Sequence, residues 1–257
     1  MFAGFPILLF RRTQVSTINY QLSTVNYQLS TVLFTQPQFE TALQEVTAQV
    51  SPKILLPNSS QLPKIPLYLF ETLPSTNQTL WEILVEGATP PTLVIAAQQT
   101  AGRGQWGRQW QSEIGGLYLS LALTLKLQAN HSSQLTFCSA WGIARVLREY
   151  GIPVFLKWPN DLILKDKKLG GILTETRVQQ GYITQAVVGV GINWCNCPPE
   201  TGISLESFCQ DQPSAKITSL AIVAAIVLYG LLAGYQFSLE EGLEKLRLFY
   251  QDLLYRS

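Results

Sequence analysis

Three short segments of the sequence combine a flexible backbone with fixed charge. Residues 102–108 read Gly-Arg-Gly-Gln-Trp-Gly-Arg, residues 157–161 read Lys-Trp-Pro-Asn-Asp, and residues 168–171 read Lys-Leu-Gly-Gly. Glycine lets a backbone turn with positive φ and approach a ligand closely. Backbone N–H groups and fixed cations can then hold a carboxylate or a phosphate. Together the segments predict a site that surrounds a small anionic substrate.

The three segments fall within a longer series of ordered motifs. The series comprises Ser75-Thr76-Asn77, residues 99–110, Leu117-Tyr118-Leu119-Ser120, residues 157–161, residues 168–175 and Gly191-Ile192-Asn193. In this order the motifs resemble those of the biotin–protein ligases, and the resemblance covers about residues 67–255.

The resemblance implies an α+β fold in which helices back a mixed β-sheet, as in the catalytic domains of class II aminoacyl-tRNA synthetases. The sequence pattern independently indicates an α+β domain, because several strands form hairpins while the helices are gathered separately. Strands are expected at 93–98, 117–127, 154–158, 162–165, 169–177 and 182–193. Helices are expected at 76–85, 135–150, 217–235 and 239–254.

Residues 1–65 differ in composition from the rest of the chain. A seven-residue unit starting at Ser16 recurs at Ser23 and begins again at Ser30, and residues 51–66 are rich in proline. The unit contains poor helix formers, so it is interpreted as a tandem duplication rather than a coiled coil. We expect a poorly ordered extension over 1–65 and a biotin–protein ligase catalytic domain over 66–257. The DNA-binding domain and the C-terminal β-barrel found in the family are expected to be absent.

The resemblance implies a two-step reaction. Biotin, the substrate, first reacts with ATP and Mg²⁺ to give biotinyl-5′-AMP and pyrophosphate. Biotin is then transferred to a lysine of the biotin carboxyl carrier protein of acetyl-CoA carboxylase, forming an amide. No enzyme nucleophile and no tightly bound prosthetic group are expected, because the adenylate is itself activated.

The family match assigns roles to individual residues. Positioned cations stabilise the charge that develops when a carboxylate attacks the α-phosphate, and Arg103, Lys168 and Asp161 are the expected catalytic residues. The expected biotin contacts are Ser75, Thr76, Asn77, Gln99, Gly102, Arg103, Gly104, Gln105, Lys168, Gly170 and Gly171. The expected ATP contacts are Arg103, Arg108, Trp110, Lys168 and Asn193, and Mg²⁺ is expected to bind through the ATP phosphates.

Several of these residues also have a structural interpretation. Ser75 and Thr76 could simply cap a helix, and the glycines at 170–171 could form a β-bulge. Lys168 is expected at the tip of a hairpin that turns over residues 166–168. Trp158 is expected in the core rather than against a ligand.

Gln105 departs from the family pattern, which has arginine at this position. Glutamine keeps the hydrogen-bonding capacity but lacks the positive charge. We therefore expect the adenylate to be held less tightly than in relatives with arginine.

Three other functions remain open at this point. A lipoate or octanoate ligase or transferase would use the same fold, and the transferases would need a nucleophilic cysteine. A non-catalytic biotin-binding remnant is the second. The apolar run at 217–235 would also suit a membrane-attached protein by hydropathy alone, but its glycines and the family match favour a buried helix.

Composition narrows the range of partners. The chain has 257 residues, 18 basic and 17 acidic side chains and a formal net charge of +1, so no basic surplus indicates nucleic-acid binding. The four cysteines match no zinc-binding spacing. They are interpreted as reduced thiols of a cytoplasmic protein, which we expect to be a monomer or homodimer without a membrane partner.

Overall fold

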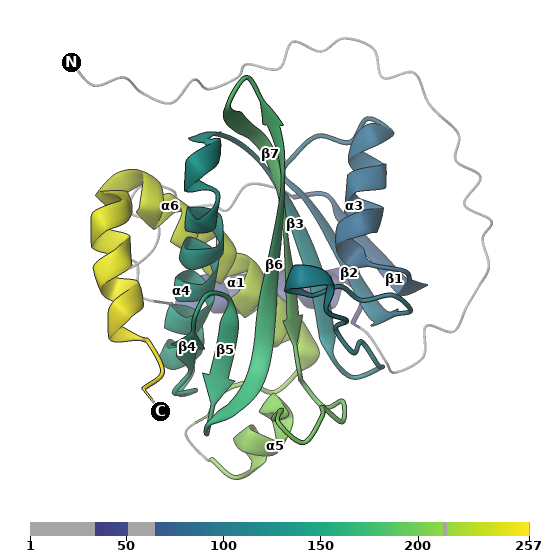
Figure 1. Cartoon of the computed structure of the whole chain (residues 1–257). Coiled ribbons are helices and arrows are strands. Elements are labelled where there is room, and N and C mark those ends of the chain that lie inside the picture. The colour runs from purple at the N-terminus through teal and green to yellow at the C-terminus, as the bar shows by residue number, and fades with distance from the viewer. Residues whose placement is uncertain (1–33, 51–64, 213–214, 257) are drawn as a thin grey trace, which may run out of the picture. The chain divides into compact units, whose positions relative to one another are not determined.

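A seven-stranded mixed sheet forms the centre of the part of the chain that the structure describes (Figure 1). The computed structural model describes residues 34–50, 65–212 and 215–256. The strand order is β1-β2-β3-β7-β6-β5-β4; β1 and β2 are parallel, and every other neighbouring pair is antiparallel. The strands are β1 Leu67–Leu73, β2 Thr92–Gln99, β3 Leu117–Gln128, β4 Phe155–Lys157, β5 Asp161–Leu164, β6 Lys167–Gln179 and β7 Tyr182–Ile192. The expected mixed sheet is confirmed.

Helices cover both faces of this sheet. They are α1 Gln36–Gln49, α3 Thr76–Val85, α4 Ser133–Glu149, α5 Leu205–Gln210 and α6 Leu220–Asp252, with short 3₁₀ turns at Gln105–Gly107 and Ala129–His131. Side chains alternate between the two faces of a strand. On β2, Leu93 and Ile95 therefore join the core with α1, α4 and α6, while Val94 and Ala96 pack against α3.

The helices α4 and α6 approach each other backbone to backbone. A Cβ atom added at Gly142 would collide with the carbonyl oxygen of Gly230, and one added at Gly234 would collide with the carbonyl oxygen of Cys138. The helix α6 is long and apolar enough to cross a membrane by length and composition, but 72% of its most apolar window is buried in the described structure. The expectation that residues 217–235 form a buried helix is confirmed.

Residues 34–50 correct the expectation of a poorly ordered extension over 1–65. Thr35 and Gln38 form a reciprocal capping box at the start of α1, which satisfies two backbone N–H groups that the helix cannot. Phe39, Ala42 and Val46 are buried in the same core as α6. The folded unit therefore begins before residue 66; the heptapeptide repeat and the residues 51–64 lie outside the described residues.

Two other expectations change in detail. The β5–β6 hairpin turns at Lys165 and Asp166, whose φ angles are 46° and 61°, so Lys168 lies within β6 and not at the hairpin tip. The two expected C-terminal helices are the two segments of α6, but the break between them lies at Gly242, where φ is 77°, and not at 236–238. The strand β1 and the helix α5 were not predicted.

Candidate active site

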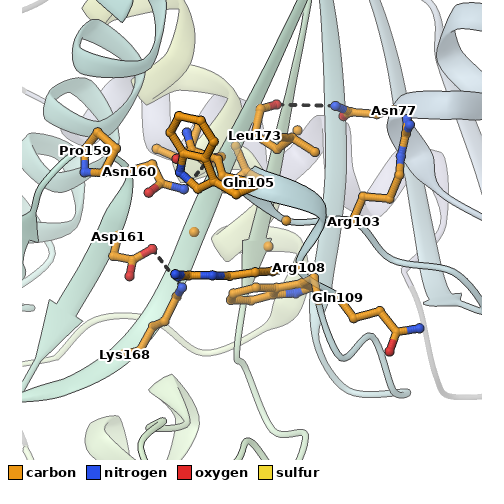
Figure 2. Close-up of a pocket in the computed structure, with 18 of the residues that line it drawn as sticks. Asn77, Arg103, Gln105, Arg108, Gln109, Pro159, Asn160, Asp161, Lys168 and Leu173 are labelled. Atoms are coloured by element: carbon orange, nitrogen blue, oxygen red, sulfur yellow. Dashed lines mark hydrogen bonds and ion pairs between the residues drawn. The ribbon is translucent and has the colours of Figure 1, made fainter.

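A cavity of about 370 Å³ lies on the α3 face of the sheet. By strand alternation Val187, Gly189 and Gly191 share one face of β7; Val187 packs with α3, and the cavity lies over the two glycines. The loop after β2 and the β4–β5 connection form the remaining walls. Figure 2 shows the charged pair Asp161 and Lys168 on one side of this cavity and Asn77 and Arg103 on the other.

Gln99 organises the polar side of the cavity. Its Oε1 accepts hydrogen bonds from the Thr76 backbone N–H at 2.8 Å and from Thr76 Oγ1 at 3.1 Å. Its Nε2 donates to Ser112 Oγ at 2.8 Å. Gln99 therefore satisfies the first backbone N–H of α3, one of the groups at a helix start that has no partner within the helix.

Ser75 is placed to contact a ligand. It occupies the N-cap position of α3, with φ −159°, but its side chain makes no capping hydrogen bond. The residue is only 3% exposed and lines the cavity. The helix-capping interpretation is thus wrong for the Ser75 hydroxyl, which is available to a bound molecule.

Asn77 is held at the floor of the polar side. Its Oδ1 accepts a 2.6 Å hydrogen bond from Ser120 Oγ, and its Nδ2 donates to Glu175 Oε2 at 2.9 Å and to the Leu173 carbonyl oxygen at 3.3 Å (Figure 2). Gly189 must be a glycine, because a Cβ atom there would overlap the Asn77 amide. This side of the cavity is therefore pre-organised before any ligand binds.

Arg103 lies on the loop that covers the cavity. Its Nη2 is 3.2 Å from both carboxylate oxygens of Glu175, and its side chain is 43% exposed. The loop is closed on itself by a 2.7 Å hydrogen bond from the Gly104 N–H to the Arg108 carbonyl oxygen. Trp106, at its apex, has φ 61° and is 87% exposed. Arg103, Gln105 and Arg108, which were expected to contact the substrates, all line the cavity.

The charged side of the cavity is built on β5 and β6. Lys168 Nζ is 2.8 Å from Asp161 Oδ1 and lies 5.2 Å from the centre of the Trp110 ring. The register shifts between Leu162 and Ile163, so that Leu169 is an extra residue on β6. This bulge lets Lys168 and Gly171 reach the same cavity, although their odd spacing would place them on opposite faces of a regular strand.

The two glycines after Lys168 have different roles. A Cβ atom at Gly171 would lie 3.3 Å from the Trp110 ring and 3.6 Å from Lys168 Cε, so Gly171 gives both side chains room at the cavity. Gly170 is buried against the Gly191 carbonyl oxygen and Ile192, and it lines neither this cavity nor the next. The expected contact of Gly170 with biotin is therefore not seen in this arrangement.

Trp158 is exposed, contrary to the expectation that it is a core residue. It is 63% exposed, lines the cavity, and packs one side of its ring on Phe137 with centroids 4.7 Å apart. Tyr250 lies beneath it and donates a 3.2 Å hydrogen bond to the Pro159 carbonyl oxygen. Burial and the negative charge of Asp161 raise the pKa of Tyr250, so its hydroxyl remains a donor.

A second cavity of about 320 Å³ shares Trp110 and Lys168 with the first. Asn193 lines it and donates from Nδ2 to the Lys168 carbonyl oxygen at 3.3 Å. Gly102 lines a third, smaller space behind the loop and not the main cavity, so its expected contact with biotin is not seen in this arrangement.

Most of the expected site residues meet at the first cavity. They are Ser75, Thr76, Asn77, Gln99, Arg103, Gly104, Gln105, Arg108, Trp110, Asp161, Lys168 and Gly171. Sequence reasoning missed Glu175 and Ser120 as members of the hydrogen-bond network, although both stand at the ends of recognised motifs. It also missed Gly189, whose only signal was an unexplained glycine within a strand.

Metal-binding and nucleophilic groups are sparse among the described residues. No group of three or more His, Cys, Asp or Glu side chains is placed to hold a metal ion there. Cys138, Cys195, Cys197 and Cys209 are free thiols, and none lines the main cavity. Burial raises the pKa of Cys195 and Cys209, and that of Cys138 to about 12, so these three thiols are poor nucleophiles.

Comparison with known proteins identifies relatives of this chain by sequence. Residues 69–193 match the Biotin/lipoate A/B protein ligase family. The chain is 37% identical over 129 residues to the bifunctional ligase/repressor BirA of Bacillus subtilis (strain 168), covering 49% of this chain and 40% of that protein. It is 32% identical over 213 residues to BirA of Escherichia coli (strain K12), covering 82% of this chain and 65% of that protein.

Solved structures of biotin protein ligases are also similar to this chain. The chain is similar to the biotin protein ligase from Aquifex aeolicus in complex with biotin and ATP, with a TM-score of 0.59 and 26% identity, covering 74% of this chain and 78% of that one. The chain spans between 38% and 65% of the length of the first four curated relatives.

Proposed function

We propose that this chain, whose residues 69–193 match the Biotin/lipoate A/B protein ligase family, is an ATP-dependent biotin–protein ligase. The observation that supports this most directly is the division of one cavity into a pre-organised polar side and a charged side that carries Lys168. A second cavity lies across Trp110 from the first. Such a site can bring a carboxylic acid and a nucleotide together at Lys168.

Biotin matches the chemistry of the first cavity. Its ureido ring carries N–H donors and a carbonyl acceptor, and its side chain is apolar up to the carboxylate. The Ser75 hydroxyl is unengaged as a cap, and Thr76 and Gln99 are fixed beside it. We place the ring at this end, because fixed polar groups determine orientation in a mostly apolar ligand site. The apolar side chain then runs beneath the covering loop, which brings the carboxylate between Arg103 on the polar side and Lys168 on the charged side.

The first step is the attack of the biotin carboxylate on the α-phosphate of ATP. A carboxylate oxygen forms a bond to phosphorus, and the bond from the α-phosphate to the bridging oxygen breaks, which releases pyrophosphate. Lys168, and Arg103 and Arg108 on the loop, supply positive charge where negative charge develops. We place the adenine and ribose in the second cavity. This cavity shares Trp110 and Lys168 with the first and is also lined by Asn193.

The first cavity offers a magnesium ion one carboxylate, that of Asp161. Mg²⁺ is usually held by one or two carboxylates together with substrate phosphates and water, and Asp161 is a carboxylate that lines the cavity beside Lys168. Asp161 and the ATP phosphates would hold the ion, and the ion would neutralise phosphate charge. Asp161 also holds the Lys168 ammonium at 2.8 Å.

In the second step we propose that a lysine of biotin carboxyl carrier protein attacks the acyl carbon of biotinyl-5′-AMP. The amide bond forms, AMP leaves, and the amine loses its proton to solvent or to AMP. A thiol intermediate is not required, and no cysteine lines the cavity among the described residues. This argues against the transferase chemistry that uses a nucleophilic cysteine.

A single assay tests this function. The full chain is incubated with Mg-ATP, an apo biotin carboxyl carrier domain, and either biotin or lipoate. We expect the carrier to gain the mass of one biotinyl group, and its target-lysine variant to gain none. Addition of lipoate in preference to biotin would replace the proposed substrate. No ATP-dependent addition of either acid would contradict the proposed ligase function.

A further inference from the structure

We infer that Glu175 is a positioning residue that orients Arg103 toward the carboxylate of the substrate, an inference that rests on the proposed function. Glu175 stands on β6 opposite Val187 and on the face that carries the cavity. Its carboxylate joins three parts of the molecule that are distant in the sequence: the loop at Arg103, the helix α3 at Asn77, and the sheet itself.

Glu175 is the residue that fixes the position of the Arg103 side chain. Among the described residues, the side-chain hydrogen bond and ion pair of Arg103 are those of Nη2 with the two Glu175 oxygens, both at 3.2 Å. The backbone of Arg103 pairs with Gln109 across the loop by an isolated bridge. Without the carboxylate, the arginine side chain would have no fixed partner and would sample several rotamers, and ordering it again on binding costs free energy.

The contact with Glu175 leaves most of the guanidinium available. Arginine has five N–H donors in a planar fork, and only Nη2 contacts Glu175. The Nη1 and Nε hydrogens can therefore face a second anion. Arg103 lines the cavity, so Glu175 orients the guanidinium without occupying the donors that a carboxylate substrate would use.

Asn77 is far less dependent on Glu175. It keeps a 2.6 Å hydrogen bond from Ser120 and one to the Leu173 carbonyl oxygen at 3.3 Å when the carboxylate contact is removed. It is also packed against Gly189 and only 3% exposed. A Glu175→Gln variant should therefore disturb the arginine selectively, and leave the polar side that receives the ring of the ligand in place.

The first experiment measures the arginine in the absence of any substrate. Trypsin cleaves after arginine, so the rate of cleavage after Arg103 reports how often this side chain and its loop leave the protein. We expect Glu175→Gln to accelerate cleavage after Arg103 severalfold, as followed by mass spectrometry. Glu71→Gln, an exposed acid on β1, should leave the rate unchanged. An unchanged rate in Glu175→Gln would overturn the inference.

The second experiment separates the carboxylate of the ligand from its ring. Calorimetry compares biotin with biotin methyl ester, which keeps the ring and lacks the charge. We expect Glu175→Gln to weaken biotin binding about tenfold, the loss expected for a hydrogen bond to a charged group, and to change ester binding less than about twofold. Equal weakening of both ligands would indicate a general structural role and would overturn the inference.

A double-mutant cycle provides the last discrimination. If Glu175 acts through Arg103, Glu175→Gln should have almost no further effect on biotin binding in an Arg103→Ala background. An undiminished effect in that background would contradict the inference. If the unsubstituted protein binds neither biotin nor its ester, the proposed function fails, and the trypsin measurement still decides whether Glu175 holds Arg103.

Discussion

Glycine has different roles in the cavity and in the helical layer behind the sheet, and the side chains around it differ in polarity. In the cavity, Gly171 and Gly191 leave space beside Trp110, and the charged side chains around it are partly exposed. In the layer formed by α1, α4 and α6, the glycines Gly142 and Gly234 allow helix backbones to touch, and the surrounding side chains are buried and apolar.

This contrast indicates that function and stability are carried by separate sets of residues. An exposed ion pair contributes at most about 1 kcal/mol to folding, so the charged residues of the cavity can change without unfolding the protein. A side chain inserted between packed helices forces backbone shifts that typically cost about 1–3 kcal/mol. Each variant below should therefore affect either the chemistry or the fold, and a variant that affects both would break the comparison.

The largest effect is expected from Lys168→Ala. Removing the cation should slow formation of biotinyl-5′-AMP about a thousandfold, as for loss of one group that stabilises transition-state charge. Its melting temperature should stay within about 3 °C, because the ion pair with Asp161 is partly exposed. Lys167→Ala, next to it and exposed, is the matched control. Pyrophosphate release at the unsubstituted rate would remove Lys168 from the mechanism.

Deleting residues 1–64 should lower stability strongly, which revises what composition alone suggests for this segment. The deletion removes α1 and the buried side chains Phe39, Ala42 and Val46. Fully burying one large apolar side chain contributes about 1.5–3 kcal/mol, so we expect the melting temperature to fall by at least about 10 °C. Deleting only residues 1–33 retains every described contact and should have little effect. Equal melting temperatures for both deletions would show that α1 is dispensable.

Gly234→Ala tests the helix contact directly. The added methyl group would collide with the Cys138 carbonyl oxygen, and we expect about 2 kcal/mol of destabilisation, or a fall of about 4–8 °C in melting temperature. Leu248→Ala, in the segment of α6 after Gly242 and 63% exposed, is the control and should change it by less than about 2 °C. At temperatures where both are folded, adenylate formation should be unchanged in both variants. Normal stability of Gly234→Ala would mean that the helices can separate at no cost.

The sequence predicted the cavity better than the layer that supports it. The charged and glycine-rich motifs identified Arg103 and Lys168 because a substrate site requires particular residue types at particular positions. The helix α1 was missed, although Thr35 and Gln38 have the spacing of a capping box and apolar residues follow at helical spacing. The repeats that precede this segment led us to treat it as poorly ordered. The local signal for a helix is weak by itself, and the helix is stabilised by packing on α6.

Some features of the site could not be read from local pattern at all. The bulge at Leu169, which turns Lys168 and Gly171 to one side, depends on the pairing of β5 with β6. Likewise, the hydrogen bond from the Thr76 N–H at the start of α3 to Gln99 forms only because β2 ends beside that helix. Trp158 was expected in the core, but it lies at the surface with its ring packed on Phe137 and near Tyr250.

The smallest effect is expected from Gln105→Arg, which adds charge to the cavity without touching the helical layer. Gln105 lines the cavity beside the exposed Trp106. A charge-assisted hydrogen bond is about twice as strong as a neutral one, so an arginine near the phosphoryl group should slow dissociation of biotinyl-5′-AMP by about three- to tenfold and reduce biotinylation of bystander lysines. The melting temperature should not change. Gln179→Arg, which adds the same charge at an exposed strand end, controls for net charge. If both arginine variants release the adenylate at the unsubstituted rate, other residues of the loop, such as Trp106 or Arg108, must retain it, and the missing charge at position 105 has no consequence for this chain.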